Sequence, residues 1–123
     1  EIVKCMIKKN ISVNGSKILV LGITFKENCP DIRNTKTVDL VTELKDYGIS
    51  ITIHDPWVDE SELKLEYGLK SSKSIPCEKF DGVVLAVSHN KFKEIDIFFF
   101  RKEKGIIYDV KNFLNQNIVD GSL

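Results

Sequence analysis

Hydrophobic residues along this chain are gathered into short blocks separated by polar segments. Three blocks, at residues 17–22, 82–87 and 105–110, are almost continuously apolar, as buried strands of a parallel sheet are. A fourth block, residues 50–54, is rich in β-branched side chains and ends at an Asp-Pro dipeptide, where a strand cannot continue. The pattern therefore predicts four strands.

The segments between these strands have helical spacing or helical end signals. Residues 34–47 repeat apolar side chains every three or four positions, and residues 59–67 begin with acidic side chains that favour a helix amino terminus. A glycine follows each of these two segments, as is common after the last turn of a helix. Residues 91–101 are predicted to form a third helix, with Phe92, Ile95 and Phe99 on one face.

The alternation of strands and helices predicts an α/β fold, a three-layer Rossmann-like domain with a four-stranded parallel sheet. No Asn-Gly turn joins two alternating blocks, so a hairpin is not expected. Right-handed crossovers favour the strand order 2-1-3-4, with a ligand crevice where the order reverses, between the first and third strands. The loops facing that crevice would be residues 22–34, 88–91 and 109–112.

The first ten residues are interpreted as the tail of a connecting helix, and residues 11–123 as the domain itself. The chain begins at Glu1 without an initiator methionine, and the apolar positions of this segment have few expected neighbours. We therefore expect a piece excised from a longer protein.

Length and charge exclude several classes of function. At 123 residues the chain is expected to be one domain with a substantial core. Its 18 basic and 18 acidic side chains cancel without forming blocks, so neither a nucleic-acid partner nor a membrane surface is predicted. No signal peptide and no apolar run long enough for a membrane span are found in the sequence, which favours a soluble, cytoplasmic protein.

The three cysteines do not predict a metal site or a nucleophile. Cys5, Cys29 and Cys77 have no CxxC spacing and no neighbouring histidine. They are interpreted as free thiols in a reducing compartment.

The loop after the first strand is the strongest candidate for ligand binding. It runs for about a dozen residues, where about 2 to 6 are usual in an α/β unit. It lacks the GxGxxG spacing of a dinucleotide site, but Lys26 and Arg33 lie near a predicted helix amino terminus, where they could bind phosphate. Alternatively, these cations pair with Glu27 and Asp31 on a solvated loop.

Three titratable residues follow the other strands. An isolated histidine such as His89 is more often a hydrogen-bonding or packing residue than a general acid or base. Asp55 and Asp109 occupy strand ends, like the phosphoacceptor of receiver-type domains, but the acidic pair that would bind magnesium is missing after the first strand. No metal is therefore predicted.

The motifs VLGITFKENCPDIRNTKTVDL, ELKDYG, HDPWVD, AVSHNKF and YDVKN together resemble the carboxyl-terminal domain of the UDP-glucose/GDP-mannose dehydrogenase family. The resemblance runs from about Met6 to the end of the chain. The form FKENCPDIRNT is most similar to the branch that oxidises UDP-N-acetylhexosamines for surface polysaccharides such as capsule or O-antigen. UDP-glucose 6-dehydrogenase is the alternative within the family.

The resemblance implies a parent enzyme in three parts: an NAD-binding domain, a central helical region that dimerises, and this UDP-binding domain. Such enzymes oxidise the sugar C6 alcohol to a carboxylate in two NAD-dependent steps through a thiohemiacetal on a cysteine. That cysteine lies upstream, so Cys29 is not expected to be catalytic. The fragment would contain no catalytic residue and would be inactive alone.

The resemblance also implies roles for residues of the long loop. Phe25 and Lys26 match positions that contact the UDP-sugar, and Arg33 matches one that reaches the NAD held mainly by the amino-terminal domain. A further substrate arginine of the family has no arginine to match after YDVKN. A candidate of another class is a stand-alone nucleotide-binding or receiver-like module without catalysis.

Overall fold

The computed structural model describes residues 1–33, 35–111, 113–114 and 118–122. Its elements in chain order are α1 (Ile2–Lys8), β1 (Lys17–Leu21), α2 (Thr37–Asp46), β2 (Ser50–His54), α3 (Glu60–Tyr67), β3 (Phe80–Leu85), the 3-10 helices η1 (Asn90–Glu94) and η2 (Ile97–Phe100), β4 (Arg101–Asp109) and β5 (Gly121–Ser122).

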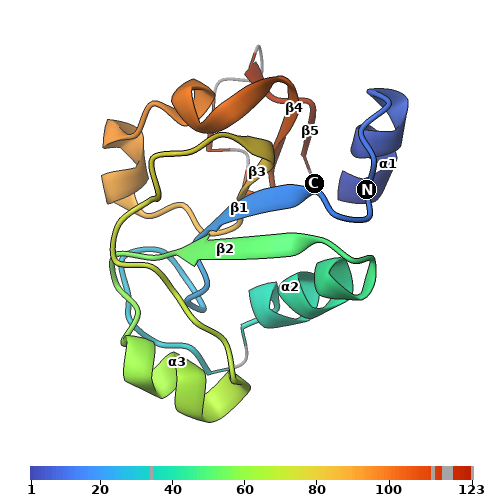
Figure 1. Cartoon of the computed structure of the whole chain (residues 1–123). Coiled ribbons are helices and arrows are strands. Elements are labelled where there is room, and N and C mark those ends of the chain that lie inside the picture. The colour runs from blue at the N-terminus through green and yellow to red at the C-terminus, as the bar shows by residue number, and fades with distance from the viewer. Residues whose placement is uncertain (34, 112, 115–117, 123) are drawn as a thin grey trace.

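The strands form one parallel sheet in the order β2-β1-β3-β4-β5 (Figure 1). The α/β class and the order of the first four strands agree with the prediction, but the sheet has five strands, not four. β5 pairs with Tyr108 and Asp109 at the end of β4. It was missed because two residues, Gly121 and Ser122, have neither apolar periodicity nor β propensity.

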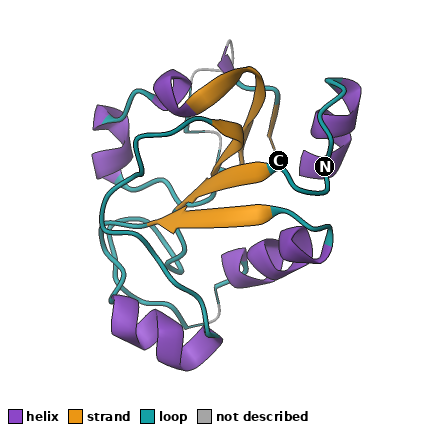
Figure 2. Cartoon of the chain, in the orientation of Figure 1, coloured by secondary structure: helices purple, strands orange, loops and turns teal. Residues whose placement is uncertain are grey.

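Helical segments cover the two faces of the sheet differently (Figure 2). On one face, strand side chains such as Val20 and Val84 join a core cluster with residues of α1, α2 and α3. On the other face, Leu21 and Leu85 pack with Phe92 of η1 and Ile97 of η2. Strand residues alternate between the faces, as the period of two in a strand requires. The central strands β1 and β3 are therefore buried on both sides.

The predicted helix over residues 91–101 is wrong. The chain instead forms η1 and η2, separated by extended backbone at Ile95 (ψ 130°) and Asp96 (ψ 93°), and Arg101 already belongs to β4. The buried side chains are Phe92 and Ile97, which are five positions apart and do not fit one helical face. Phe99, expected on that face, is 48% exposed. The run of aromatic and β-branched residues disfavours a regular helix.

Helix α1 is better packed than the sequence indicated. Its residues Ile2 and Met6 are buried in the core cluster of α2 and α3, whereas Ile7 is 60% exposed. The same end of the chain is tied to β5, because Lys9 forms an ion pair of 2.8 Å with Asp120. The expectation that these apolar positions have few neighbours is corrected for Ile2 and Met6, which share a core cluster with Ile106 and Tyr108 of β4.

The other two helices confirm the predicted elements, with shifted starts. α2 begins at Thr37, and residue 34, where a start was considered, lies outside the described residues. α3 has the predicted ends: the Asp59 side chain accepts a hydrogen bond from the amide of Glu62, and Gly68 closes the helix in the left-handed conformation with φ 69°.

The exit of β1 requires glycine. Gly22 has φ +98°, and a Cβ atom there would lie 2.5 Å from Cβ of Val87. The segment after β1 therefore passes directly over the segment after β3, which brings the two following loops together.

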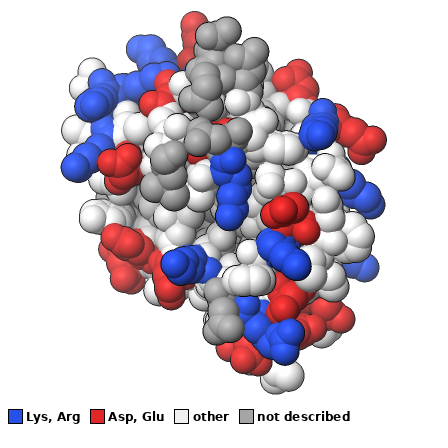
Figure 3. Space-filling model, turned by 180° about the vertical axis from the view of Figure 1, so that it is seen from behind, with Lys and Arg blue, Asp and Glu red and all other residues white. Residues whose placement is uncertain are grey.

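Charged side chains of both signs are interspersed on the face drawn in Figure 3, in agreement with the absence of charge blocks in the sequence. Among the described residues, no helix is long and apolar enough to cross a membrane.

Candidate functional site

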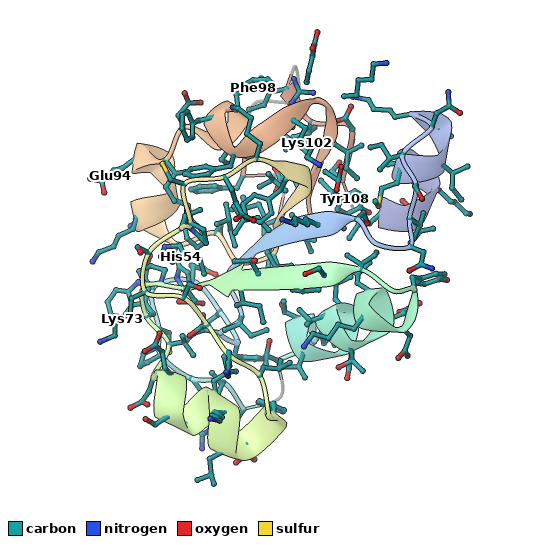
Figure 4. The ribbon with its side chains drawn as sticks, viewed as in Figure 1. His54, Lys73, Glu94, Phe98, Lys102 and Tyr108 are labelled. Carbon is teal, nitrogen blue, oxygen red and sulfur yellow. The ribbon has the colours of Figure 1, made fainter. Side chains whose placement is uncertain are left out.

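The candidate site is built where β1, β2 and β3 end at their carboxyl termini. The long loop after β1 meets the turns that follow β2 and β3, as expected for ligand sites in parallel sheets. Figure 4 marks this edge of the sheet by His54, the last residue of β2.

Asp55 is the polar centre of this edge. Its side chain is buried, with 4% of the residue exposed. Its Oδ2 accepts hydrogen bonds from the amides of Ile23 (2.9 Å) and Thr24 (3.1 Å), and its Oδ1 accepts one from the amide of Trp57 (2.7 Å). One carboxylate thereby fixes both the start of the long loop and the turn after β2.

The surroundings of Asp55 favour its ionised form. Burial raises the pKa of this carboxyl, but the hydrogen bonds from His89 and from the amides of Ile23 and Trp57 lower the pKa more, so the net shift is downward. A buried carboxylate with donors on both oxygens is stable in its site, and its function here is structural support.

His89 connects Asp55 to the long loop. The ring is fully buried and lies edge-on to Phe92, with ring centroids 5.3 Å apart. Its Nδ1 accepts a hydrogen bond from the amide of Asn28 at 2.8 Å, so Nε2 carries the hydrogen and donates it to Oδ2 of Asp55 at 3.0 Å. This agrees with the prediction of a hydrogen-bonding and packing role. Both ring nitrogens are occupied by protein atoms.

His89 contacts the long loop at two residues: Thr24, whose Oγ1 lies 3.1 Å from Nε2, and Asn28. Asn28 adopts φ +56°, a left-handed conformation that asparagine tolerates better than most residues. Its side-chain Oδ1 accepts a hydrogen bond from the amide of Asn90 at 2.9 Å. The loops after β1 and β3 are thus joined by a pair of hydrogen bonds at one residue.

Phe25 and Lys26, the predicted substrate residues, lie between these fixed points and are exposed. The amide of Phe25 donates to the carbonyl of Asp31 (2.6 Å), and the hydroxyl of Thr24 donates to the carbonyl of Lys26 (3.1 Å). Among the described residues no hydrogen bond or ion pair engages the Lys26 ammonium. This part of the loop therefore exposes one aromatic ring and one cation.

Phe25 also lines a cavity of about 540 Å³ between α1, α2 and the ends of β3 and β4. Most of its lining is apolar, and its charged lining residues are two cations, Lys36 and Lys111, and two carboxylates, Glu1 and Glu43. Tyr108, labelled in Figure 4, lies in it with its hydroxyl 3.4 Å from the Glu1 carboxylate. Burial raises the pKa of the Tyr108 phenol, and the charge of Glu1 adds to this.

Arg33, the predicted cofactor residue, lies on the surface of the loop and not with Phe25 in the cavity. Its side chain is 83% exposed and forms a bidentate ion pair with Asp31, with Nε–Oδ1 and Nη2–Oδ2 distances of 3.1 and 3.0 Å. The Arg33 guanidinium lowers the pKa of the Asp31 carboxyl. The alternative of ion pairing on a solvated loop is thus realised for Arg33, whereas no such pair forms between Lys26 and Glu27 or Asp31 among the described residues.

A second buried carboxylate has a similar structural role after β4. Asp109 is fully buried and accepts hydrogen bonds from the amides of Lys111 (3.1 Å) and Leu114 (2.7 Å). It closes the loop in which Asn112 lies outside the described residues, as does Asn115 further on. Neither Asp55 nor Asp109 is free to act as a phosphoacceptor, because the backbone amides occupy their oxygens.

The described residues do not form a dinucleotide cradle. The glycine after β1 is in contact with Val87, and α2 begins only at Thr37, so no helix amino terminus directly follows β1. Within the part of the chain that the structure describes, no three His, Cys, Asp or Glu side chains come together as metal ligands.

The sequence singled out Phe25 and Lys26, which are exposed on this loop, but missed the residues that hold the loop in place. Asn28 gave no signal, because its role depends on a backbone conformation. Asp55 was noticed only as the end of a strand, and His89 as an isolated histidine. Lys36 at the cavity wall lies outside the loops predicted to face the crevice, whereas Lys111 belongs to one of them, residues 109–112. The sequence signal that could have identified Asp55 and His89 was their place in the chain, because both follow buried strands that adjoin β1.

Comparison with known proteins places this geometry in context. Residues 19–116 match the sequence profile described as the UDP binding domain of the UDP-glucose/GDP-mannose dehydrogenase family. The UDP-N-acetyl-D-glucosamine 6-dehydrogenase of Salmonella typhi is 46% identical over 93% of this chain and 28% of that protein. The protein of the same name from Pseudomonas aeruginosa is 41% identical over 98% of this chain and 29% of that protein.

A solved structure agrees on the fold. The NDP-N-acetyl-D-galactosaminuronic acid dehydrogenase of Methanosarcina mazei Go1 superposes with a TM-score of 0.80 and 21% identity, covering 94% of this chain and 25% of that one. The chain thus spans less than a third of the length of these relatives.

Proposed function

Because the chain belongs to the UDP-glucose/GDP-mannose dehydrogenase family, in which it matches the UDP-binding domain, we propose that it is the UDP-sugar-binding domain of an NAD-dependent UDP-N-acetylhexosamine 6-dehydrogenase. The observation that carries the proposal is the identity of 46% and 41% to two UDP-N-acetyl-D-glucosamine 6-dehydrogenases over nearly the whole chain. The exposed loop at the carboxyl ends of the strands supplies a site of the right kind.

The parent enzyme would divide its work between domains. Residues 1–10 are the end of a connecting helix, and residues 11–123 bind the UDP-sugar. The upstream parts hold most of the NAD, the catalytic cysteine and the dimer contacts, so this domain alone is inactive. The parent oxidises the sugar C6 alcohol to the carboxylate in the cytoplasm. The small share of the relatives that this chain covers, and its lack of a dinucleotide cradle among the described residues, support this division.

Within the domain, the chemistry of the loop suggests distinct roles for its exposed side chains. Lys26 is a cation without a protein partner among the described residues, suited to the diphosphate of the ligand. Phe25 offers an aromatic surface beside the cavity. Arg33 is exposed on the loop surface, where it can meet NAD held by another domain. These contacts orient the substrate for chemistry performed elsewhere.

Lys26→Ala in the parent enzyme tests the substrate site. A charge-assisted hydrogen bond contributes about 1.5–3 kcal/mol, so KM for the UDP-sugar should rise roughly tenfold or more with little change in kcat. The matched control is Lys104→Ala, which removes an exposed lysine from the amino-terminal half of β4, away from the carboxyl ends of the strands. It should leave KM unchanged. An unaltered KM in Lys26→Ala would remove the proposed role.

The hexosamine branch needs a separate measurement. We expect the parent to reduce NAD with a UDP-N-acetylhexosamine at a higher kcat/KM than with UDP-glucose, followed as NADH absorbance. A preference for UDP-glucose would assign the chain to the other branch. No NADH production with any UDP-sugar would favour a nucleotide-binding module without catalysis.

A further inference from the structure

We propose that Asn28 and His89 form a clasp that positions Phe25 and Lys26 for the UDP-sugar, with Asp55 holding His89 in the tautomer that the clasp needs. These three are positioning residues and do not touch the ligand. The inference rests on the proposed function of Phe25 and Lys26, and adds the part of the site that sets their geometry.

The need for a clasp follows from the exposure of the ligand residues. The segment from Phe25 to Asn28 is exposed, whereas Ile23 and Thr24 immediately before it are buried. Hydrophobic burial alone does not fix this segment, because its one large apolar side chain, Phe25, is 50% exposed. Its position is therefore set by hydrogen bonds to groups that are themselves immobile.

The hydrogen bonds of the clasp end on rigid parts of the fold. Asn28 donates its amide to Nδ1 of His89 and accepts the amide of Asn90 on its side chain, at 2.8 and 2.9 Å. His89 has no exposed surface and packs edge-on to Phe92. Movement of the loop would leave the buried Nδ1 without a donor, which is costly in a site closed to water.

Asp55 fixes which ring nitrogen of His89 carries the hydrogen. Because Oδ2 of Asp55 can only accept, His89 must keep its hydrogen on Nε2, and Nδ1 is then left as an acceptor for the Asn28 amide. The same Oδ2 accepts the amides of Ile23 and Thr24, which precede the ligand residues. The loop is thus held on both sides of Phe25 and Lys26 through one buried carboxylate.

Two substitutions at His89 in the parent enzyme separate positioning from packing. His89→Asn keeps an acceptor near the place of Nδ1, whereas His89→Gln keeps a donor toward Asp55 but loses that acceptor. We expect KM for UDP-N-acetylglucosamine to rise roughly threefold to tenfold in His89→Gln, with kcat within about twofold of wild type. His89→Asn should stay closer to the wild-type KM.

The chain offers a matched control at its other histidine. His54 is also buried, bonds the Ser72 carbonyl through Nδ1, and has its ring centroid 6.2 Å from that of Phe92, but among the described residues its side chain makes no hydrogen bond to the long loop. His54→Gln should keep the wild-type KM. The difference in Tm between His54→Gln and wild type measures how much stability is lost when a buried imidazole is removed.

The outcomes distinguish this inference from the proposed function. Equal KM values in His89→Gln and His54→Gln would overturn the clasp. It would also be overturned if KM rose equally in His89→Gln and His89→Asn and the rise in each variant matched its loss of Tm. A rise in KM in Lys26→Ala alongside either result would leave the substrate site standing. An unchanged KM in Lys26→Ala would overturn the site and the clasp together.

Discussion

At the scale of single residues, the site depends on buried polar groups whose hydrogen bonds are satisfied. Asp55 receives hydrogen bonds from His89 and from the amides of Ile23, Thr24 and Trp57. Burying a charge is unfavourable unless donors replace the water it loses, and here backbone amides do so. In the proposed clasp, the buried Asp55 carboxylate sets the position of the exposed side chains Phe25 and Lys26.

Asp55→Asn tests this support. An asparagine must direct its NH2 group at one of the amides, donor against donor, so we expect a loss of roughly 1–3 kcal/mol in the free energy of unfolding, measured with urea at pH 7. Asp46→Asn, at an exposed residue of α2, is the control and should change stability by less than about 0.5 kcal/mol. A neutral Asp55→Asn would contradict the support.

The pH dependence of the same carboxylate gives an independent check. Its folded pKa lies below the ordinary value of 3.8, so its ionised form stabilises the folded state fully above that value. The contribution is lost as pH falls through the lower, folded pKa. The stability of wild type should therefore fall more steeply below about pH 4 than that of Asp55→Asn.

At the scale of elements, α1 is part of the domain core as well as the start of the chain. Met6 has no exposed surface, whereas Ile7, its neighbour, is 60% exposed. Adjacent residues on a helix point in different directions, so a single helix carries both a buried and an exposed apolar side chain.

Met6→Ala and Ile7→Ala form a matched pair in this helix. Met6→Ala should lower the free energy of unfolding by about 2–5 kcal/mol, because it removes a fully buried side chain and leaves a cavity. Ile7→Ala should cost less than about 1 kcal/mol. Chemical denaturation of the two variants measures the difference. Equal effects would mean that α1 does not pack on the sheet as described.

At the scale of the whole molecule, the side chains proposed to bind ligands are exposed at one end of the sheet. Lys26 and Arg33 are both exposed on the long loop, but Arg33 is turned to Asp31 and does not line the cavity. Two exposed cations on one loop can therefore serve two different ligands when another domain lies opposite.

Arg33→Ala in the parent tests the contact with NAD. Loss of a guanidinium that binds the cofactor should raise the Kd for NAD roughly threefold to tenfold, measured by calorimetry, while KM for the UDP-sugar changes little. Lys104→Ala again serves as the control for lost positive charge at an exposed residue of β4. Wild-type affinity for NAD in Arg33→Ala would withdraw the assignment and leave Arg33 as the ion-pair partner of Asp31.

The sequence by itself determined the α/β class, the four main strands with their order, and α2 and α3, because these depend on local periodicity, capping residues and glycine stops. It also singled out the long loop after β1 as the candidate for ligand binding, because the length of that loop is visible without a fold. It mistook residues 91–101 for a helix, because apolar spacing alone cannot show which side chains the sheet will bury. It missed β5, because that strand exists only through pairing with Tyr108 and Asp109.

Only the tertiary structure decided how the loop is held. Asn28, Asp55 and His89 are distant in sequence and each is ambiguous alone, since an isolated histidine or a strand-end aspartate has many common roles. The parallel order of β2, β1 and β3 brings their carboxyl ends together, and the close approach of Gly22 to Val87 brings the loops within hydrogen-bonding distance. Such contacts between non-local residues follow from the packing of the sheet, which no local sequence pattern encodes.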